Sequence, residues 1–536
     1  MTNSHSVNRE KERTKMASGV LVMLTISSIL IAPIIVTGPA ATASFVTPAA
    51  SNSNTTSPQN DETGYTPGVQ PLTTADLATP GNLTAASSCQ GTGSANIAVS
   101  LSWSDSQSSS LDADQNPLLS GYTVWRSASP SGPFTQVGSV ASSGSTQAAT
   151  SYTDVNPSGA PTPYAYVANA NASTVSVIDT STNTVTTTIT LPTPTGGTTP
   201  EPYAVAITPN GSYAYVADYA NGVVDVIDTS TNAVTTTITL PTPTGGTTPG
   251  PDAVAITPNG SYAYVVDYAN GVVDVIDTST NAVTATITLP GTNTPEPYAV
   301  AITPNGSYAY VADFDNDIVD VIDTSTNAVT TTIALPAPDS RFTYAPDAVA
   351  ITPNGSYAYV AVYVYKTANS ATENGVVDVI DTSTNTVTTT ISLTKPPAGL
   401  APIPTAVAIT PNGCSVYVTD FDNDIEDVID TSSNTVTTTI TLTDAPDLGP
   451  YGVAITPNDS TAYVATYYNY NTSTYTTIVD PLDLSNNTLG STITVGSGPY
   501  AVAVQPSTYY YEVQAYATNW TSAYSAVIPI TLGFVY

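Results

Sequence analysis

Four aspartates recur along the chain, and each is followed directly by an aromatic residue. The pairs are Asp218 and Tyr219, Asp267 and Tyr268, Asp313 and Phe314, and Asp420 and Phe421. Further tyrosines occupy neighbouring or equivalent segments, at Tyr363, Tyr365, Tyr467, Tyr468 and Tyr470. Aromatic rings beside carboxylates suit sugars, because a sugar ring has apolar faces for stacking and hydroxyls that donate hydrogen bonds. These residues predict a ligand-binding surface; the simpler alternative is that Asp begins a turn and the ring covers an edge.

Two short stretches carry alternating carboxylates of the kind that calcium loops use. They are DFDND at Asp313, Asp315 and Asp317, and DFDND at Asp420, Asp422 and Asp424. An EF-hand needs Gly at its sixth position and Glu at its twelfth. The first stretch has Ile318 and Thr324 there. A hairpin turn is therefore the favoured interpretation, with calcium as the alternative and no other cofactor expected.

The residue types needed for most catalytic sites are missing. The only histidine is His5, near the N-terminus. Without another histidine the chain cannot build a Ser-His-Asp triad, a Cys-His pair or an imidazole metal site. No glycine-rich phosphate loop follows any expected strand. We expect no enzyme, and a carboxylate-based glycosidase, a lactonase or a lyase is the alternative.

The chain has two cysteines, Cys89 and Cys414. A disulfide between them requires Cα atoms less than about 7 Å apart. Such a bridge is geometrically feasible if the segments that carry them meet, but two free thiols are the favoured interpretation.

The elements that position these residues repeat. Close copies of residues 202–241, PYAVAITPNGSYAYVADYANGVVDVIDTSTNAVTTTITLP, recur from about residue 161 to 506. Seven copies align on the Asp that ends the VIDTS-like strand: Asp179, Asp228, Asp277, Asp323, Asp381, Asp430 and a degenerate Asp480. Each copy predicts four strands, here 204–207 (a), 213–217 (b), 223–227 (c) and 234–240 (d), separated by Asn-Gly and DTSTN turns. Strand a is apolar on both faces and strand d on one, as a radial four-stranded blade requires.

The YVAN at Tyr166, YVAD at Tyr215 and YVTD at Tyr417, each beside P-x-A-V-A-I-T-P-N-G and VIDTS strands, resemble the YVTN family of β-propeller repeats. The resemblance covers roughly two-thirds of the chain. It implies a seven-bladed propeller like those of surface-layer proteins, and it implies little about chemistry.

The strand count predicts how the ring closes. The first copy begins at Tyr164 with strand b, and a lone strand a, residues 499–504, follows the seventh copy. We expect this C-terminal strand to complete the first blade, because closure leaves few exposed edges.

Different segments flank the repeats. Residues 1–43 predict an export signal, with four basic residues, an apolar run and small residues at its end; an uncleaved membrane anchor is the alternative. Residues 44–78 predict a disordered Ser/Thr/Pro-rich linker. Residues 79–160 resemble the first part of a fibronectin type III domain, and residues 507–536 its last two strands. The propeller, residues 161–506, would then be inserted into this sandwich, because insertion is tolerated where chain ends lie close together.

This insertion gives each propeller face a different environment. The chain enters at strand b and leaves after strand a, so the sandwich is expected on the face that holds the a-b and c-d turns. The b-c and d-a connections, which vary most in length, then lie on the free face. Variable loops of this kind often mark a binding face.

Charge limits the partners. The formal net charge is −33, with 8 basic and 41 acidic residues, so nucleic acid is excluded because phosphate binding needs clustered cations. We expect an exported extracellular or cell-surface protein that binds cell-envelope polysaccharide or a surface protein. A structural surface-layer component is the alternative. A chain with so few basic residues can form few ion pairs. Protonation of its carboxylates would therefore cost little stability, which suggests an acidic habitat.

Overall fold

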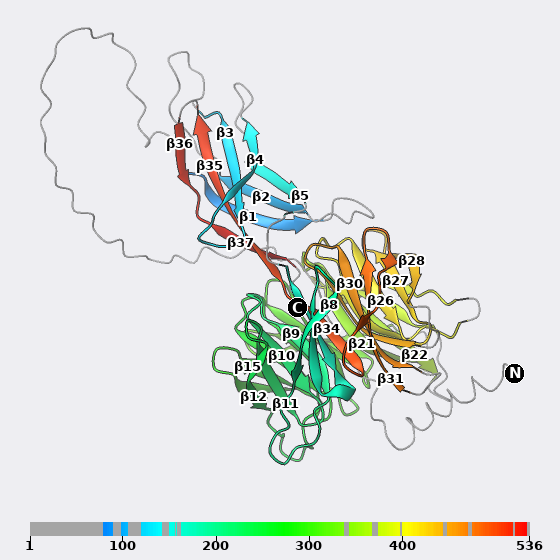
Figure 1. The fold of residues 1–536 in the computed structure, drawn as a ribbon. Coiled ribbons are helices and arrows are strands. Elements are labelled where there is room, and N and C mark those ends of the chain that lie inside the picture. Colours follow the sequence, from blue (N-terminus) through cyan, green and yellow to red (C-terminus); the bar gives the residue numbers. More distant parts are fainter. Residues whose placement is uncertain are drawn as a thin grey trace, which may run out of the picture.

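The protein was analysed as a computed structural model that describes residues 79–88, 98–104, 119–141, 150–155, 157, 162–336, 342–366, 374–396, 399–442, 448–469, 474–517 and 520–532. Within them the fold is all-β, with one short 3₁₀ helix, η1 (Ala170–Ala172). The strands form two groups (Figure 1). The larger group contains the sequence repeats.

Seven repeat sheets hold the repeats, each with the strand order a-b-c-d. Sheet 1 contains β34 (Pro499–Val504), β6 (Tyr164–Asn169), β7 (Thr174–Asp179) and β8 (Thr184–Thr190). Sheet 2 contains β9 (Pro202–Ile207), β10 (Tyr213–Asp218), β11 (Val223–Asp228) and β12 (Ala233–Thr239). Sheet 3 contains β13 (Pro251–Ile256), β14 (Tyr262–Asp267), β15 (Val272–Asp277) and β16 (Ala282–Thr288). Sheet 4 contains β17 (Pro297–Ile302), β18 (Tyr308–Asp313), β19 (Ile318–Asp323) and β20 (Ala328–Ala334).

The remaining repeat sheets differ mainly in length. Sheet 5 contains β21 (Phe342–Ile351), β22 (Tyr357–Lys366), β23 (Val376–Asp381) and β24 (Thr386–Ser392). Sheet 6 contains β25 (Pro404–Ile409), β26 (Ser415–Asp420), β27 (Ile425–Asp430) and β28 (Thr435–Thr441). Sheet 7 contains β29 (Leu448–Ile455), β30 (Thr461–Asn469) and β31 (Thr474–Asp483), and its outer strand is split into β32 (Thr488–Leu489) and β33 (Ile493–Thr494).

The inner strands of the repeat sheets contact one another in order. The contacts join β9 with β13, β13 with β17, β17 with β21, β21 with β25, β25 with β29, β29 with β34, and β34 with β9. Strand β34 also pairs with β6, with Val502 opposite Val167. Strand β34, which follows sheet 7 in the sequence, is therefore the inner strand of sheet 1.

Burial decreases from the inner strand to the outer strand of each sheet. All six residues of β9 are buried, whereas β12 alternates exposed threonines with partly or fully buried apolar residues. The apolar inner strands thus form the core, and the outer strands are wet on one face.

Side-chain hydrogen bonds join each repeat sheet to the next. The Tyr of the YVAN or YVAD motif donates its hydroxyl to the last Asn of the DTSTN turn in the following sheet, for example Tyr264 to Asn327 Oδ1 at 2.6 Å. Such pairs connect all seven sheets: Tyr166 with Asn232, Tyr215 with Asn281, Tyr264 with Asn327, Tyr310 with Asn385, Tyr359 with Asn434, Tyr417 with Asn487, and Tyr463 with Asn183. These seven Asn residues have φ between 52° and 55°, a left-handed conformation that Asn tolerates better than most residues.

The smaller group of strands comes from both ends of the sequence, drawn blue to cyan and red in Figure 1. One sheet contains β1 (Gly81–Ser88), β2 (Ala98–Ser104) and β5 (Ser151–Val155). The other contains β36 (Trp520–Tyr524), β35 (Ser507–Ala517), β3 (Gly121–Ser127) and β4 (Thr135–Ala141), with β37 (Ile528–Leu532) also paired to β35. Both sheets contribute to one core that includes Trp103, Tyr122 and Tyr511.

The two parts of this smaller group are linked by polar contacts. Arg126 on β3 forms an ion pair with Asp154 on β5 at 2.5 Å. Tyr511 on β35 donates its hydroxyl to the same carboxylate at 2.8 Å. Residues before and after the repeats therefore share one core.

The chain enters and leaves the repeat region at neighbouring points. The backbone N–H of Tyr164 donates to Gln505 Oε1 at 3.1 Å, and Gln505 N–H donates to the Tyr164 carbonyl at 2.8 Å. Gln505 Nε2 also donates to the Gly211 carbonyl in an a-b turn. The junction thus lies at the a-b end of the sheets. The predicted signal (1–43) and linker (44–78) lie outside the described residues, and no described helix is long and apolar enough to cross a membrane.

Candidate functional site

A β-bulge occurs at the start of every inner strand of the repeat sheets. In β9, for example, Pro202 pairs with Asp218 and Ala204 with Ala217, so Tyr203 is the extra residue. The same shift leaves one extra residue in each sheet. These seven residues, which we call the axial ring, are Tyr203, Asp252, Tyr298, Asp347, Thr405, Tyr451 and Tyr500. A bulge re-aims a side chain and is common beside functional sites.

The tyrosines of the axial ring contact one another across sheet boundaries. The ring of Tyr500 stacks on that of Tyr203 with centroids 4.5 Å apart, and Tyr451 lies 4.8 Å from Tyr500. All four axial tyrosines are at most 5% exposed. The centre of the b-c/d-a face is therefore filled by packed aromatic side chains over sheets 7, 1 and 2.

Two members of the axial ring are carboxylic acids. Asp252 is fully buried and Asp347 is 4% exposed. Burial raises the pKa of Asp347 well above its usual value, and the charge of Asp252 raises it further. Tyr298, which lies between them in the order of sheets, has a raised pKa, first through burial and then through the charges of Tyr268, Asp347, Glu296 and Asp252.

A second group of aromatic rings, which we call the rim, lies beside the axial ring. Tyr219 stacks on Tyr203 at 4.7 Å, Phe314 lies 4.7 Å from Tyr298 and Phe421 lies 4.8 Å from Tyr451. Tyr219 and Tyr268 are 6.4 Å apart, so aromatic contacts run continuously from sheet 4 to sheet 2. Each of the rim residues Tyr219, Tyr268, Phe314 and Phe421 directly follows strand b of its sheet.

The rim is densest on sheet 7. Tyr467 contacts Tyr451, Tyr468, Tyr475 and Tyr500, with centroid separations of 5.0 to 6.5 Å. Tyr475 is 42% exposed, and Tyr467 and Tyr468 are partly exposed. Tyr363 and Tyr365 form a separate pair on β22, 5.2 Å apart. Tyr470 lies outside the described residues.

Two glutamates lie beside the rim and are partly exposed. Burial raises the pKa of Glu296 to about 7, and the charge of Asp315 contributes, while a hydrogen bond from Tyr268 opposes the shift. Burial and the charge of Asp218 raise the pKa of Glu201. Sequence reasoning missed both glutamates and the axial ring. The sequence does carry a signal for them, which is the Pro near the start of each strand a. Each glutamate directly precedes this Pro, and each axial residue directly follows it.

The four aspartates of the Asp-aromatic pairs do not face solvent. Asp218, Asp267, Asp313 and Asp420 are all fully buried. Asp218 Oδ1 accepts from the Glu201 N–H at 2.9 Å, and Oδ2 accepts from Asn221 Nδ2 at 2.7 Å. The other three make the same two kinds of bond. These carboxylates join the d-a connection to the b-c turn, and their contact with a ligand stays a prediction.

The DFDND stretches form turns. Asp315 is exposed, and Asp317 Oδ1 accepts from the Tyr344 N–H at 3.2 Å. In the second stretch, the Asp422 N–H donates to Asp420 Oδ1. Among the described residues, no three His, Cys, Asp or Glu side chains gather into a group that could hold a metal ion. Calcium at Asp313, Asp315 and Asp317, or at Asp420, Asp422 and Asp424, stays a prediction.

Cys414 is disulfide-bonded and 3% exposed, in the a-b turn between β25 and β26. The free thiol favoured from the sequence is therefore wrong for Cys414. The chain has one other cysteine, Cys89, which lies outside the described residues.

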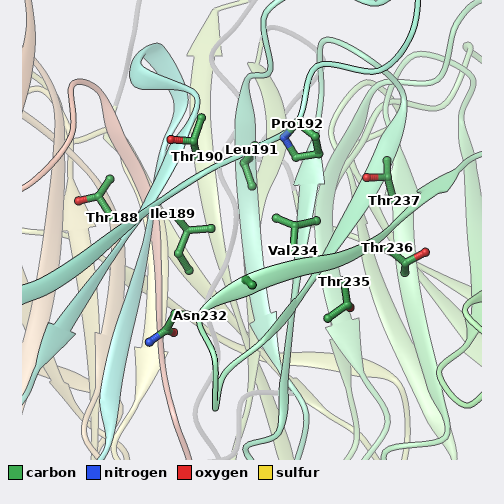
Figure 2. A pocket seen from close by; sticks show the side chains of 11 residues that line it. Thr188, Ile189, Thr190, Leu191, Pro192, Asn232, Val234, Thr235, Thr236 and Thr237 are labelled. Atoms are coloured by element: carbon green, nitrogen blue, oxygen red, sulfur yellow. The ribbon is translucent and has the colours of Figure 1, made fainter.

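A groove of about 660 Å³ lies on the outer side of the repeat sheets, between β8 and β12 (Figure 2). Its lining mixes threonine hydroxyls with Ile189 and Val234. Asn232 at its edge accepts the Tyr166 hydroxyl at 2.7 Å. The groove therefore marks the join between two sheets, and its open threonine lining lacks the convergent polar groups typical of a ligand site.

Comparisons with known proteins agree with the repeat fold. A family model described as "Lactonase, 7-bladed beta-propeller" matches residues 134–362. No curated protein matches. Among solved structures, Kuenenia stuttgartiensis hydrazine synthase is 20% identical and covers 61% of this chain and 95% of its own, with a TM-score of 0.48. The Cps50 (Swd1) β-propeller domain of Myceliophteria thermophila is 13% identical and covers 61% of this chain and 96% of its own, with a TM-score of 0.44. The seven repeat sheets and the family model together identify the repeat region as a β-propeller.

Proposed function

We propose that the protein is exported and binds cell-envelope polysaccharide or a surface protein through the b-c/d-a face of its propeller. The observation that carries this proposal is the continuous aromatic rim. Partly exposed rings lie beside partly exposed carboxylates at Glu201 and Glu296. Aromatic rings are enriched in recognition surfaces because they offer large contact areas at low entropic cost.

The proposed architecture is a YVTN-type propeller whose ring is closed by β34 and which is inserted into a fibronectin type III-like sandwich. Pairing of β34 with β6 and the shared core of β3 and β35 support it. The hydrogen bond between Tyr164 and Gln505 at the junction supports a position of the sandwich at the a-b end. The opposite face, with the rim, is then available to a partner.

Location outside the cell is supported by the disulfide at Cys414, because disulfides persist in oxidising compartments. The basic and apolar N-terminal segment also supports export. The alternative is a structural surface-layer component, in which the same face would contact further copies of the chain. Ordered arrays seen by microscopy would favour this role, and saturable binding of a soluble ligand would favour recognition.

A glycan array probed with the purified protein tests the proposal. We expect saturable binding to envelope polysaccharide, which Tyr468→Ala weakens because a partly exposed rim ring is removed. Tyr262→Ala is the matched control, since Tyr262 is 38% exposed but begins strand b at the opposite end of sheet 3. Absence of binding to any polysaccharide, or equal loss in both variants, would contradict recognition of sugars by the rim.

The family model favours a second candidate, hydrolysis of a lactone. The axial acids Asp252 and Asp347 would supply the acid and the base for this hydrolysis, since a protonated carboxyl can act as general acid and an ionised one as general base. Turnover of lactones that is abolished by Asp347→Asn and retained in Asp323→Asn would favour an enzyme. No turnover across aliphatic and sugar lactones leaves the binding proposal in place.

A further inference from the structure

The a-b turns of sheets 2 to 5 share one sequence, Thr-Pro-Asn-Gly-Ser-Tyr, and one pattern of hydrogen bonds. Their Asn residues are Asn210, Asn259, Asn305 and Asn354. In sheet 2, Asn210 Oδ1 accepts from the Thr208 hydroxyl at 2.7 Å and from the Ser212 N–H at 3.0 Å. The other three turns form the same two bonds. The carbonyl oxygen of each Asn side chain therefore holds its turn.

The other polar groups of these Asn and Ser side chains are not used by the turn. Asn210 Nδ2 and Ser212 Oγ form no hydrogen bond with any described residue, and both residues are exposed. The same is true of the three equivalent pairs. A tight hairpin accounts for Asn-Gly, but it does not require a Ser hydroxyl. Asn-X-Ser is, however, the acceptor sequence for an N-linked glycan.

We propose that these four turns are glycosylated, with one N-linked glycan at each of Asn210, Asn259, Asn305 and Asn354. The donor class is a glycan joined through phosphate to a lipid carrier, and a transferase of the producing cell supplies catalysis. Asn Nδ2 attacks the anomeric carbon, the bond from that carbon to the phosphate oxygen breaks, the lipid phosphate leaves, and Nδ2 loses one proton. The inference rests on the export part of the proposed function, because such sequences accept glycans on surface loops of secreted proteins.

The first argument is the contrast with other Asn-Gly turns of the propeller. The b-c turn of sheet 2 has Asn221 followed by Gly and Val, and Asn221 Nδ2 donates to Asp218 Oδ2 at 2.7 Å. In the a-b turn of sheet 6, Asn412 is 4% exposed and the third residue is the disulfide-bonded Cys414. In these comparisons Ser is present where the Asn amide is exposed and unused, and it is absent where the amide is bonded or buried.

The second argument is that geometry separates these turns from a sequence of the same type elsewhere. Asn171-Ala172-Ser173 also has the acceptor pattern. There Asn171 Nδ2 donates to Ser497 Oγ at 3.0 Å, and the Ser173 hydroxyl donates to the Pro200 carbonyl at 2.6 Å. Because both reacting groups are engaged, we expect Asn171 to stay unmodified. Further acceptor sequences, which are not part of the proposal, begin at Asn54, Asn82, Asn458, Asn471, Asn486 and Asn519.

The third argument is the exposed tyrosine that follows each of the four acceptor sequences. Tyr213, Tyr262, Tyr308 and Tyr357 are 38 to 42% exposed. The Tyr213 N–H donates to the same Thr208 hydroxyl that bonds Asn210, at 3.0 Å. An apolar ring face therefore lies in the same turn as each amide, where an attached sugar can cover it. The a-b turns of sheets 6 and 7 end in Ser415 and Thr461 instead.

Mass spectrometry of peptides from the full chain, isolated from the cells that produce it, tests the proposal. We expect glycan masses on the peptides that contain Asn210, Asn259, Asn305 and Asn354. Peptides that contain Asn171 or Asn412 should have their unmodified masses. Glycans on these two residues, with none on the four turns, would contradict the geometric argument.

Two substitutions of one serine separate the acceptor sequence from the turn. Ser212→Ala should remove the glycan from Asn210, so the intact mass should fall by one glycan beyond the change in side chain. The turn should persist, because Asn210 Oδ1 bonds the backbone N–H of residue 212 and not its hydroxyl. Ser212→Thr is the matched control, since it keeps the acceptor sequence and should keep the glycan. A glycan that remains on Asn210 in Ser212→Ala would overturn the proposal.

The location of the isolated protein distinguishes failure of this inference from failure of the proposed function. Exported protein whose four turns are unmodified would contradict glycosylation and leave export in place. Unmodified protein found inside the cell alone would contradict both.

Discussion

Individual polar residues in this protein act mainly inside the fold. The Tyr of the YVAD motif joins neighbouring sheets through its hydroxyl, and the Asp of the same motif joins the d-a connection to the b-c turn. The Asp that begins each DTSTN turn accepts from the Ser two residues later, as Asp228 does from Ser230 N–H at 2.8 Å. The residues of these recurring motifs therefore have a structural role.

Loss of one sheet-joining hydroxyl should be measurable. Tyr264→Phe removes the donor to Asn327 Oδ1 and leaves a part-buried acceptor unsatisfied, so the free energy of unfolding should fall by about 1 to 2 kcal/mol. Urea denaturation followed by far-UV circular dichroism measures this change. Tyr262→Phe is the control because its ring is 38% exposed, and it should leave the midpoint unchanged. An equal effect of both substitutions would mean that the hydroxyl does not join the sheets.

The buried carboxylates predict that the folded protein is more stable in acid than at neutral pH. Burial raises the pKa of Asp225, Asp274 and Asp378 to about 6, and that of Asp320 to about 8. Between the unfolded-state pKa near 4 and these values, the folded state binds more protons, so stability is fully present below about pH 4 and is lost as pH rises through 6 to 8. The exposed turn acids, including Asp323, have lowered pKa values, and their contribution is lost only at still lower pH.

Melting temperature measured from pH 3.5 to 8 tests this linkage. We expect a maximum near pH 4 and a steady decrease above it. Asp320→Asn should reduce the decrease between pH 6 and 8, because both oxygens of Asp320 lack hydrogen-bond partners among the described residues, and Asp323→Asn should not. A melting temperature that rises from pH 4 to 8 would show that other groups dominate, and it would also count against an acidic habitat.

Bulges, turns and hydrogen-bonded pairs determine how whole strands are placed. In sheets 2 and 4 the Pro that begins the inner strand pairs with the Asp that ends strand b, and the next residue is the extra residue of a bulge. At the other end of the sheets, strands from separate parts of the sequence meet, and Asp154 accepts from both Arg126 and Tyr511. A single carboxylate thus connects β3, β5 and β35.

Substitution of this carboxylate should destabilise the smaller group of strands. Asp154→Ala leaves the partly buried guanidinium of Arg126 without its ion-pair partner Asp154, so the unfolding free energy should fall by about 3 kcal/mol or more. All three tryptophans, Trp103, Trp125 and Trp520, belong to these strands, so tryptophan fluorescence in urea reports their unfolding selectively. Ser139→Ala, an exposed change on β4 of the same group, is the control. An unchanged midpoint in Asp154→Ala would contradict a stabilising role for the pair.

At the scale of the whole molecule, a β-propeller interrupts a second, smaller set of strands. Both junctions lie at the a-b end of the repeat sheets, where Gln505 bonds Tyr164 and the Gly211 carbonyl. Cys414 lies in an a-b turn as well and is disulfide-bonded. The a-b end therefore carries the junction with the smaller group of strands, and the opposite end is the surface that we propose for partners.

The disulfide has a direct measurement. Thiol titration in denaturant should detect no free thiol before reduction and two after it, because Cys414 is bonded and the chain has two cysteines. Cys414→Ser should lower the midpoint of thermal unfolding, since a cross-link that closes a long loop commonly contributes about 2 to 4 kcal/mol. Two reactive thiols in the unreduced protein would contradict the bond.

The sequence by itself determined the repeated four-stranded unit, because alternation of apolar residues and Asn-Gly and DTSTN turns are local signals. It also predicted that residues 499–504 pair with the strand at Tyr164, since an unpaired inner strand would leave backbone groups unsatisfied. It did not determine which polar residues face solvent. Asp218 ends strand b and bonds a loop, whereas Asp252 is the extra residue of a bulge, and a bulge changes the direction of a side chain. Only the tertiary structure brings β34 into contact with both β29 and β9, because the circular packing of seven sheets joins the last inner strand to the first.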